Sequence, residues 1–516
     1  MSVATKSAKW LYTEFGVGAV VDSGRDTWFV IVMRTCRMLA FGAVSLIFAL
    51  FMSALGYSDS RIGLFMTATL AGDVMLSLLV TLVADRVGRR RVLFAGAAMM
   101  VVSGLVFVLF ENYWILLFAA VVGVVSTTGT DFGPFRSIEE STLSHLTRPA
   151  TRADVLSWYV TSSSLGSAVG TEISGRIVVA LKSSRGDAHI KDLYHAIFWV
   201  YVATGAISMV LTLLMSKRCE IEKQTPEDDA QGGTQAAEPL LEMQPRGSTE
   251  RDRNDWSDDD GDNGPRGATP GLAKAQPASR SWFQRMMNYS GLSGGDWESR
   301  SVIIKLWILL TIDSLADGMV SYSLTNYYLA KKFDLSEAYL GDIMSISYLL
   351  MAVSTVFSGP LARYLGLINT MVFTHLPSSA AVLFFPMPQS LPLSIVLLFI
   401  RTGLNNMDQG PRAAFIAAVV KPEERTAVMG ITATLRTLAA TIGPSLTGFL
   451  ADTDRFWIAY VIAGALRIGY DLGLFYLFIG IKMNAYEPAD EDDDNDHDDT
   501  AADERDSTSR GREGNA

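Results

Sequence analysis

The chain has 516 residues and a formal net charge of −11, and 49% of its residues are hydrophobic. Its mean hydropathy is +0.24 although it contains long polar segments, which excludes an ordinary soluble protein. Two cysteines exclude a disulfide framework. Because the acidic residues gather in two polar tracts while the turns between apolar segments are basic, the charge predicts no nucleic-acid partner.

Twelve apolar segments are each long enough for a transmembrane helix, which needs about 20 residues. They lie at 28–54, 62–84, 92–110, 113–141, 153–181, 195–216, 303–329, 339–358, 367–386, 391–418, 424–451 and 456–482. The preceding residues contain no continuous apolar stretch of the kind that a cleaved signal peptide has. We therefore expect an integral multi-pass membrane protein, and twelve spans place both termini on one side of the bilayer.

The turn between the second and third segments has the sequence TLVADRVGRRRVLF. Its charges must lie at a membrane face, because a charge at mid-depth costs roughly 2.5–3.5 kcal/mol or more, and its arginines mark that face as cytoplasmic. Gly88 permits a tight reversal there. The turn resembles the signature G-x-x-x-D-R/K-x-G-R-R/K of the major facilitator superfamily. The matching residues are Asp85, Arg86, Gly88, Arg89 and Arg90, and Thr81 replaces the first glycine.

The two halves of the apolar region repeat one another, and glycines keep their register between the copies. The aligned pairs are Gly63 and Gly341, Gly88 and Gly366, Gly170 and Gly443, and Gly175 and Gly448. Six helices, a linker and six related helices form the plan of the superfamily. We therefore predict an all-α membrane protein with twelve transmembrane helices in two pseudo-symmetric six-helix bundles.

Polar tracts rich in Asp, Glu, Gly, Pro and Ser separate and follow the bundles, and such tracts cannot bury a core. The predicted organisation is a cytoplasmic N-terminus at 1–27, an N-terminal bundle at 28–216, a disordered acidic cytoplasmic linker at 217–301, a C-terminal bundle at 302–483 and a disordered acidic cytoplasmic tail at 484–516.

Charged residues near the cytoplasmic ends of the helices suggest a gate. In the superfamily, signature arginines bridge to a carboxylate on helix four, and the signature aspartate lies near the start of helix eleven. The resemblance implies that Arg89 or Arg90 pairs with Asp131 or Glu139, and that Asp85 faces helix eleven. Such contacts would hold the cytoplasmic side shut. Ordinary interfacial charge is the alternative interpretation.

Further residues belong to the same predicted gate. Arg363 and Asp408 would form the related pair in the second half, and Arg136 and Glu140 are spaced for contact on one helical face. The complete predicted gate consists of Asp85, Arg86, Gly88, Arg89, Arg90, Asp131, Arg136, Glu139, Glu140, Arg363, Asp408 and Arg412.

A second group of charges lies near mid-depth. Asp313 and Asp317 are four residues apart and share a helical face. A carboxylate that alternates between an apolar environment and a nearby arginine can carry a proton. Asp313 is the first candidate for this role, Asp317 and Asp73 follow, and Arg401 or Arg436 would be the competing partner. The alternative is a permanent ion pair between helices.

Helix ten adds Asn405 and Asn406 as candidates for substrate contact. Arg467 and Asp471 are interpreted as structural, because helix twelve is an outer support in this superfamily. The five histidines show no metal-ligand spacing, and no nucleophile with a base stands out. We therefore expect no enzyme, no cofactor and no metal site.

The leading hypothesis is a monomeric secondary active transporter in the lipid bilayer that moves a small-molecule substrate by alternating access, with protons as the driving ion. Gly166, Gly170 and Gly175 resemble the Gly-rich fifth-helix motif of drug–proton antiporters, although the proline of that motif is missing, and this resemblance implies antiport and efflux. A passive uniporter and a non-transporting sensor or receptor of the same fold are the alternatives. Buried carboxylates and guanidiniums together suit anionic, cationic and amphoteric solutes alike.

Overall fold

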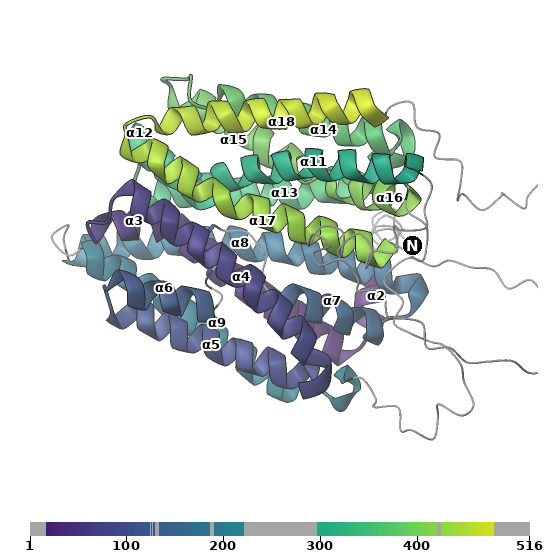
Figure 1. The fold of residues 1–516 in the computed structure, drawn as a ribbon. Helices are drawn as coiled ribbons and strands as arrows, with labels where there is room; N and C mark the ends of the chain where they lie inside the picture. The colour runs from purple at the N-terminus through teal and green to yellow at the C-terminus, as the bar shows by residue number, and fades with distance from the viewer. Residues whose placement is uncertain are drawn as a thin grey trace, which may run out of the picture.

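The computed structural model describes residues 17–123, 125, 127–128, 134–185, 190–220, 297–419 and 425–478. The regular elements of these residues are all helices (Figure 1). Most of the predicted linker, the predicted tail after residue 483 and Asp131 of the predicted gate fall outside them. The side chains of residues 81–86 and of Arg363 are likewise outside the description.

The N-terminal half forms one helical bundle, drawn purple to blue in Figure 1. Its elements are α2 (Val17–Asp22), α3 (Arg25–Ala54), α4 (Asp59–Val87), α5 (Arg89–Leu109), α6 (Tyr113–Val122), α7 (Pro134–Leu146), α8 (Pro149–Arg185), α9 (Ile190–Leu214) and the short 3-10 helix η2 (Lys217–Cys219). Within the bundle α3 packs against α8 and α9, and α5 packs against α9.

The C-terminal half forms the second bundle, drawn teal to yellow. Its elements are α11 (Trp297–Met319), α12 (Tyr322–Phe333), α13 (Glu337–Leu365), α14 (Leu367–Phe384), α15 (Leu391–Asn405), α16 (Gln409–Val419), α17 (Arg425–Asp452) and α18 (Phe456–Phe478). Here α11 packs against α17 and α18, and α14 packs against α15 and α18.

Seven of the described helices are long and apolar enough to cross a membrane by length and composition, namely α3, α4, α5, α9, α13, α14 and α18. Three other predicted spans are each divided into two helices. The span predicted at 113–141 comprises α6 and α7, that at 303–329 comprises α11 and α12, and that at 391–418 comprises α15 and α16. Hydropathy alone does not locate such breaks, because composition is similar on both sides of them.

The break between α11 and α12 is stabilised by a hydrogen-bond donor from another helix. It leaves the carbonyl of Val320 outside the helical hydrogen-bond ladder, and an unsatisfied carbonyl in hydrocarbon costs several kcal/mol. Arg401 of α15 donates from Nη2 to this carbonyl and from Nη1 to Thr325 Oγ1 at 2.9 Å. The arginine therefore stabilises the broken helix at mid-depth.

The repeat that the glycines predicted corresponds to two equivalent helix crossings. α4 meets α17 where a Cβ on Gly63 would lie 2.9 Å from the Cα of Gly448. α8 meets α13 where a Cβ on Gly341 would lie 3.4 Å from the Cα of Gly175. Because Gly63 aligns with Gly341 and Gly448 with Gly175, the same close contact joins the two bundles twice.

The two tight turns of the repeat also correspond. Gly88 between α4 and α5 has φ 104°, and Gly366 between α13 and α14 has φ 83°. L-residues with a side chain rarely adopt such positive φ values. The prediction that Gly88 permits a tight reversal is confirmed by this backbone conformation.

The polar contacts between the bundles lie on one side of the molecule. We define the terminal face as the end at which α2 and the C-terminal end of α18 lie, on the right in Figure 1. The hydrogen bonds and ion pairs described between the two bundles lie at mid-depth or toward the opposite face. These pairs are Ser60–Asp452, Tyr327–Asp59, Lys331–Asp59, Arg176–Asp342, Tyr194–Glu337, Tyr327–Ser53, Ser445–Thr67, Ser323–Thr127 and Asn326–Ser45.

Candidate functional site

A cavity of about 410 Å³, lined by both polar and apolar residues, lies between the two bundles. The N-terminal bundle contributes residues from α3, α4, α7 and α8, and the C-terminal bundle contributes residues from α11, α12, α13, α15, α16 and α17. Among the predicted site residues, the cavity is lined by Asp317, Arg401, Arg436, Asn405, Asn406, Arg136 and Arg412. Of the residues predicted to contact protons or substrate, Asp317, Arg401, Arg436, Asn405 and Asn406 line the cavity, whereas Asp313 and Asp73 do not.

Asp317 is the carboxylate that faces the cavity, and its side chain is 35% exposed. Its Oδ1 lies 2.5 Å from Nη1 of Arg467 on α18, which is fully buried. The partner of Asp317 is therefore Arg467 and neither Arg401 nor Arg436, the two predicted partners. Burial of an arginine in this position requires the carboxylate, because an uncompensated charge in the interior is costly.

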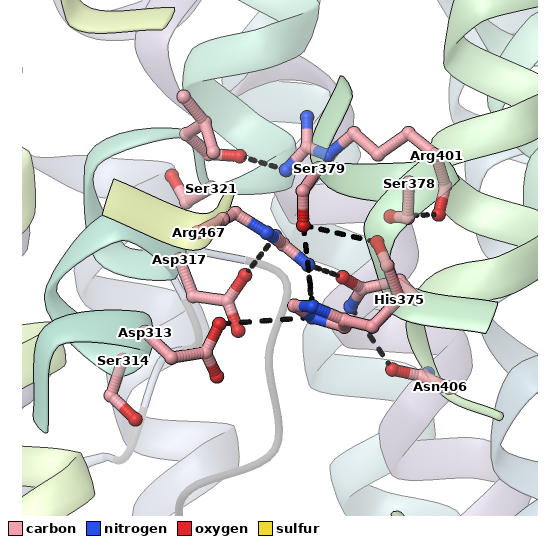
Figure 2. Close-up of polar contacts among 12 residues, drawn as sticks. Asp313, Ser314, Asp317, Ser321, His375, Ser378, Ser379, Arg401, Asn406 and Arg467 are labelled. Carbon is pink, nitrogen blue, oxygen red and sulfur yellow. Dashed lines mark hydrogen bonds and ion pairs between the residues drawn. The ribbon is translucent and has the colours of Figure 1, made fainter. Parts of the chain in front are cut away.

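His375 of α14 occupies the centre of a buried cluster behind that wall (Figure 2). Its Nδ1 lies 2.7 Å from Asp471 Oδ1, and its Nε2 lies 2.7 Å from Arg467 Nη2. A guanidinium can only donate, so Nε2 is the accepting nitrogen and Nδ1 carries the proton that is donated to Asp471. This tautomer is assigned from the hydrogen-bond network. Ser379 Oγ completes the arrangement by donating to Asp471 Oδ2 at 2.6 Å.

Asp313 lies one helical turn from Asp317 and is 1% exposed. Its Oδ1 is 3.7 Å from His375 Nε2, and this oxygen accepts no hydrogen bond from the described residues. Figure 2 shows Asp313 and Asp317 directed from α11 toward the same imidazole and guanidinium. The structure thus brings the two predicted carboxylates together around a histidine.

The remaining arginines of the cavity wall have different surroundings. Arg436 donates from Nε to Ser314 Oγ at 3.1 Å. Arg412 forms an ion pair with Asp408 at 2.8 Å within one helical turn. Arg401 bonds the broken end of α11, as described above.

One asparagine, Asn405, connects the cavity to the cluster. Asn405 lines the cavity and accepts a hydrogen bond from Arg467 Nη2. Its neighbour Asn406 accepts from Gln409 Nε2 at 3.1 Å. By contrast, Asp73 is buried on α4 in the N-terminal bundle and is not among the residues that line the cavity.

The N-terminal bundle holds a separate buried ion pair. Arg37 of α3 donates from both Nη atoms to Glu139 at 2.7 and 2.5 Å, and Tyr159 donates its hydroxyl to Glu139 at 2.7 Å. The partner of Glu139 is therefore Arg37 and neither Arg89 nor Arg90, the predicted partners. The difference arises because α3 packs closely against α8, and Arg37 of α3 and Tyr159 of α8 both reach Glu139 in the interior of the bundle.

Other members of the predicted gate lie near the terminal face. Arg136 pairs with Glu140 at 2.8 Å, as their spacing predicted. Arg89 Nη1 approaches the carbonyl of Ser141 at 3.5 Å, and Arg90 Nη2 donates to the carbonyl of Leu213 at 3.3 Å. The side chains of Asp85, Arg86, Asp131 and Arg363 fall outside the described part of the chain.

Three residues of the cluster were not assigned a functional role from the sequence, namely His375, Arg467 and Asp471. The resemblance to the superfamily makes helices nine and twelve outer supports, and the histidines show no metal-ligand spacing, so neither observation points to these residues. The available signal was that each is ionisable and lies in the middle of an apolar segment, which marks a functional candidate by itself.

The fold defines this chain as a helical membrane protein with two related bundles around a central cavity. It belongs to the Major Facilitator Superfamily, because the model of that family matches residues 30–284 and 306–498. This confirms the predicted fold, and it makes the chain a member of a family of membrane transport proteins.

Known proteins similar to this chain include an uncharacterised membrane protein of Saccharomyces cerevisiae, YJR124C, which is 34% identical over 447 residues and covers 86% of this chain and 92% of its own length. A mutant form of the nucleoside transporter NupG is similar in structure, with a TM-score of 0.63, 12% identity and coverage of 88% and 100% of the two chains. The xylose transporter XylE from E. coli, in a partially occluded inward-open conformation, has a TM-score of 0.60, 12% identity and coverage of 88% and 98%.

Proposed function

We propose that this protein is a secondary active transporter that moves a small solute by alternating access and couples this movement to protons. The observation that carries the proposal is a cavity of about 410 Å³ between the bundles, bordered by the buried cluster around His375. The described contacts between the bundles lie on one side of the cavity. Opening of these contacts, with closure at the terminal face, would expose the cavity to the other side of the membrane.

In this proposal the proton acts through an exchange of partners around His375. With Nε2 unprotonated, the imidazole accepts from Arg467, which also holds Asp317. A proton on Nε2 makes the contact with Arg467 a repulsion between two cations and directs an N–H toward Asp313, whose Oδ1 is 3.7 Å away. Asp313 and His375 then share the proton, and Arg467 is released.

Asn405 gives a route by which the solute and the proton influence each other. Its side chain lines the cavity and also accepts from Arg467. A solute that hydrogen-bonds Asn405 therefore competes with Arg467 for the same amide oxygen. Such competition is the differential interaction that any coupling requires.

The gate and the orientation are parts of the same proposal. Arg136 and Arg412 line the cavity from opposite bundles, and each has a carboxylate partner within four residues. Approach of the two pairs would allow an exchange of partners that closes the terminal face. We assign this face to the cytoplasm because Arg89, Arg90 and Arg91 lie there.

The test is a substrate screen with the purified full-length protein in sealed vesicles, with and without an imposed pH gradient. We expect at least one compound to accumulate against its own gradient when the pH gradient is present. Equilibration that ignores the pH gradient would replace the proposal with a passive uniporter. Binding without any flux across a broad panel would replace it with a sensor.

A further inference from the structure

Two arginines of the cavity wall have no acidic partner among the described residues. Arg401 and Arg436 line the cavity. The hydrogen bonds described for their guanidinium groups go to neutral oxygens of Val320, Thr325 and Ser314, and Arg401 also lies over the ring of Tyr322. No carboxylate within the described residues lies at ion-pair distance from either guanidinium. A buried cation without an anion is costly, so these two groups favour a negatively charged ligand.

Asp313 is 1% exposed and is not among the residues that line the cavity, and the other carboxylates near the cavity are engaged elsewhere. Asp317 pairs with Arg467, Asp408 with Arg412, and Asp471 with His375. A cationic solute would therefore have to break one of these pairs, whereas an anionic solute would find positive charge already in place. The preference for an anion follows from which charged residues are paired with each other, and the residue types of the cavity wall alone do not reveal it.

The two arginines bond the C-terminal end of α11 and the break that follows it. Arg436 donates to Ser314 of α11, and Arg401 donates to the carbonyl of Val320, six residues further along the chain. Beside Val320 the wall carries Ser321, which is 5% exposed and whose hydroxyl has no hydrogen-bond partner among the described residues. Arg436 uses only Nε in its described hydrogen bond, which leaves both Nη groups for a ligand. Bidentate donation of this kind suits a carboxylate or a phosphate.

We propose that the cavity binds a solute with an anionic group, a carboxylate or a phosphate, through Arg436 and Arg401, and that this solute is transported together with a proton. The inference rests on the proposed transport function and narrows it to symport of an anion with a proton, in place of the antiport that the glycines of the fifth helix favour.

The direction of coupling follows from the position of Asp313, which is adjacent to Ser314 and hence to Arg436. Charged and titratable groups face Asp313 from every element packed against it. α17 contributes Arg436 and α14 contributes His375. The remaining groups are Arg467, Tyr470 and Asp471 from α18, Arg412 and Asp408 from α16 and its N-terminus, and Asp317 from α11 itself. While ionised, Asp313 lies beyond ion-pair distance from Arg436 but still lowers the positive potential around that guanidinium. Once protonated, it leaves the charge of Arg436 to the solute, so the proton and the anion promote each other's binding.

The test measures binding without flux, so that its failure is distinct from failure of transport. Purified full-length protein in detergent is titrated with benzoate, succinate and inorganic phosphate, with benzamide and succinamide as neutral controls, and the thermal unfolding midpoint reports binding. We expect at least one anion to stabilise the protein and the amides not to do so. Comparison of the carboxylates with phosphate identifies the anionic group.

Variants identify the site. Arg436→Gln and Arg401→Gln should each lower the affinity for the anion that stabilises the wild type roughly ten- to hundredfold, which is the loss expected for a charge-assisted hydrogen bond. Arg436→Lys should retain part of the affinity, and Arg455→Gln, an exposed arginine outside the cavity, should leave it unchanged. Affinity should rise as the pH falls in the wild type, whereas Asp313→Asn should bind tightly at every pH.

Several outcomes would overturn the inference. These are stabilisation by the amides equal to that by the anions, no stabilisation by any of the anions at millimolar concentration, or affinity unchanged in Arg436→Gln and Arg401→Gln. Where size-exclusion chromatography shows that a glutamine variant is poorly folded, the affinity of Arg436→Lys for the anion and the pH dependence of the wild-type affinity test the inference instead. Affinity that falls as the pH falls would refute the symport coupling even if the anion binds.

Discussion

Glu139 illustrates what a single buried charge requires. Its side chain is 0% exposed, and its negative charge is compensated by Arg37 and by the hydroxyl of Tyr159. Removal of one member of a buried pair leaves the other charge uncompensated, which typically costs about 3–5 kcal/mol.

We therefore expect Glu139→Gln to lower the thermal unfolding midpoint of the detergent-solubilised protein strongly. Glu172→Gln is the matched control, because Glu172 pairs with an arginine whose side chain is 60% exposed, and pairs of that kind contribute about 0–1 kcal/mol. Equal shifts in the two variants would mean that the pair within the N-terminal bundle contributes little to stability.

Cys219 gives a prediction outside the membrane-spanning helices. It is 0% exposed in η2, and burial raises the pKa of its thiol to about 12. Because the thiolate is the reactive form, the thiol should be almost wholly protonated at neutral pH, and its alkylation should accelerate as the pH rises.

The measurement is maleimide labelling of the Cys36→Ser protein across a pH series. We expect slow labelling of Cys219 near pH 7. The control replaces Cys36 and Cys219 by serine and introduces Arg218→Cys at the exposed neighbouring position, which should be labelled quickly. Equal rates at the two positions would show that the environment of Cys219 is open to water.

The residue scale also shows where sequence reasoning was sufficient. Asp313, Asp317, Arg401 and Arg436 could be predicted because a charge in an apolar span is rare and must be compensated. Their partners could not be predicted, because pairing depends on the rotation of each helix about its axis. An error of one residue in the register of a helix turns a side chain by about 100°. The sequence therefore does not decide whether Asp317 faces Arg467 of α18 or Arg401 of α15.

At the scale of elements, the twelve spans follow from hydropathy and the repeated glycines predict the contacts between bundles. The divided helices were missed, because a break such as that at Val320 depends on a distant donor, Arg401, which the local sequence does not reveal. Close helix approach was easier to predict, since only glycine leaves room for a neighbouring backbone.

The crossing of α8 and α13 yields a prediction about conformation. A Cβ on Gly175 would lie 2.6 Å from the carbonyl oxygen of Glu337, which is too close for packed atoms. Gly175→Leu should therefore push the two bundles apart at the end opposite the terminal face, because overpacking typically costs about 1–3 kcal/mol. The variant should favour the state that is open at that opposite end.

Spin labels at Ser184→Cys on α8 and Tyr339→Cys on α13, in a protein without other cysteines, measure this separation. We expect the distance distribution to shift to longer values in Gly175→Leu. Gly469→Leu is the control, because nothing lies within 4 Å of a Cβ at that position. An unchanged distribution in Gly175→Leu would mean that the crossing is not a point about which the bundles move.

At the scale of the whole molecule, the polar contacts described between the bundles join them at mid-depth and on the side away from the terminal face. The cavity lies between the bundles, and the cluster of Asp313, Asp317, His375 and Arg467 lies in one bundle only. This arrangement lets the C-terminal bundle carry the proton-dependent chemistry while both bundles form the solute cavity. The central claim is that Asp313 belongs to the step that couples protons to solute movement.

The most direct test of that claim compares two kinds of flux in sealed vesicles, using the labelled substrate that the screen identifies. Asp313→Asn should abolish accumulation driven by a pH gradient and should retain counterflow exchange, which needs binding and alternating access but no net proton movement. Asp454→Asn, at an exposed turn, should behave like the wild type in both. Retained accumulation in Asp313→Asn, or equal loss of accumulation and exchange, would contradict the account.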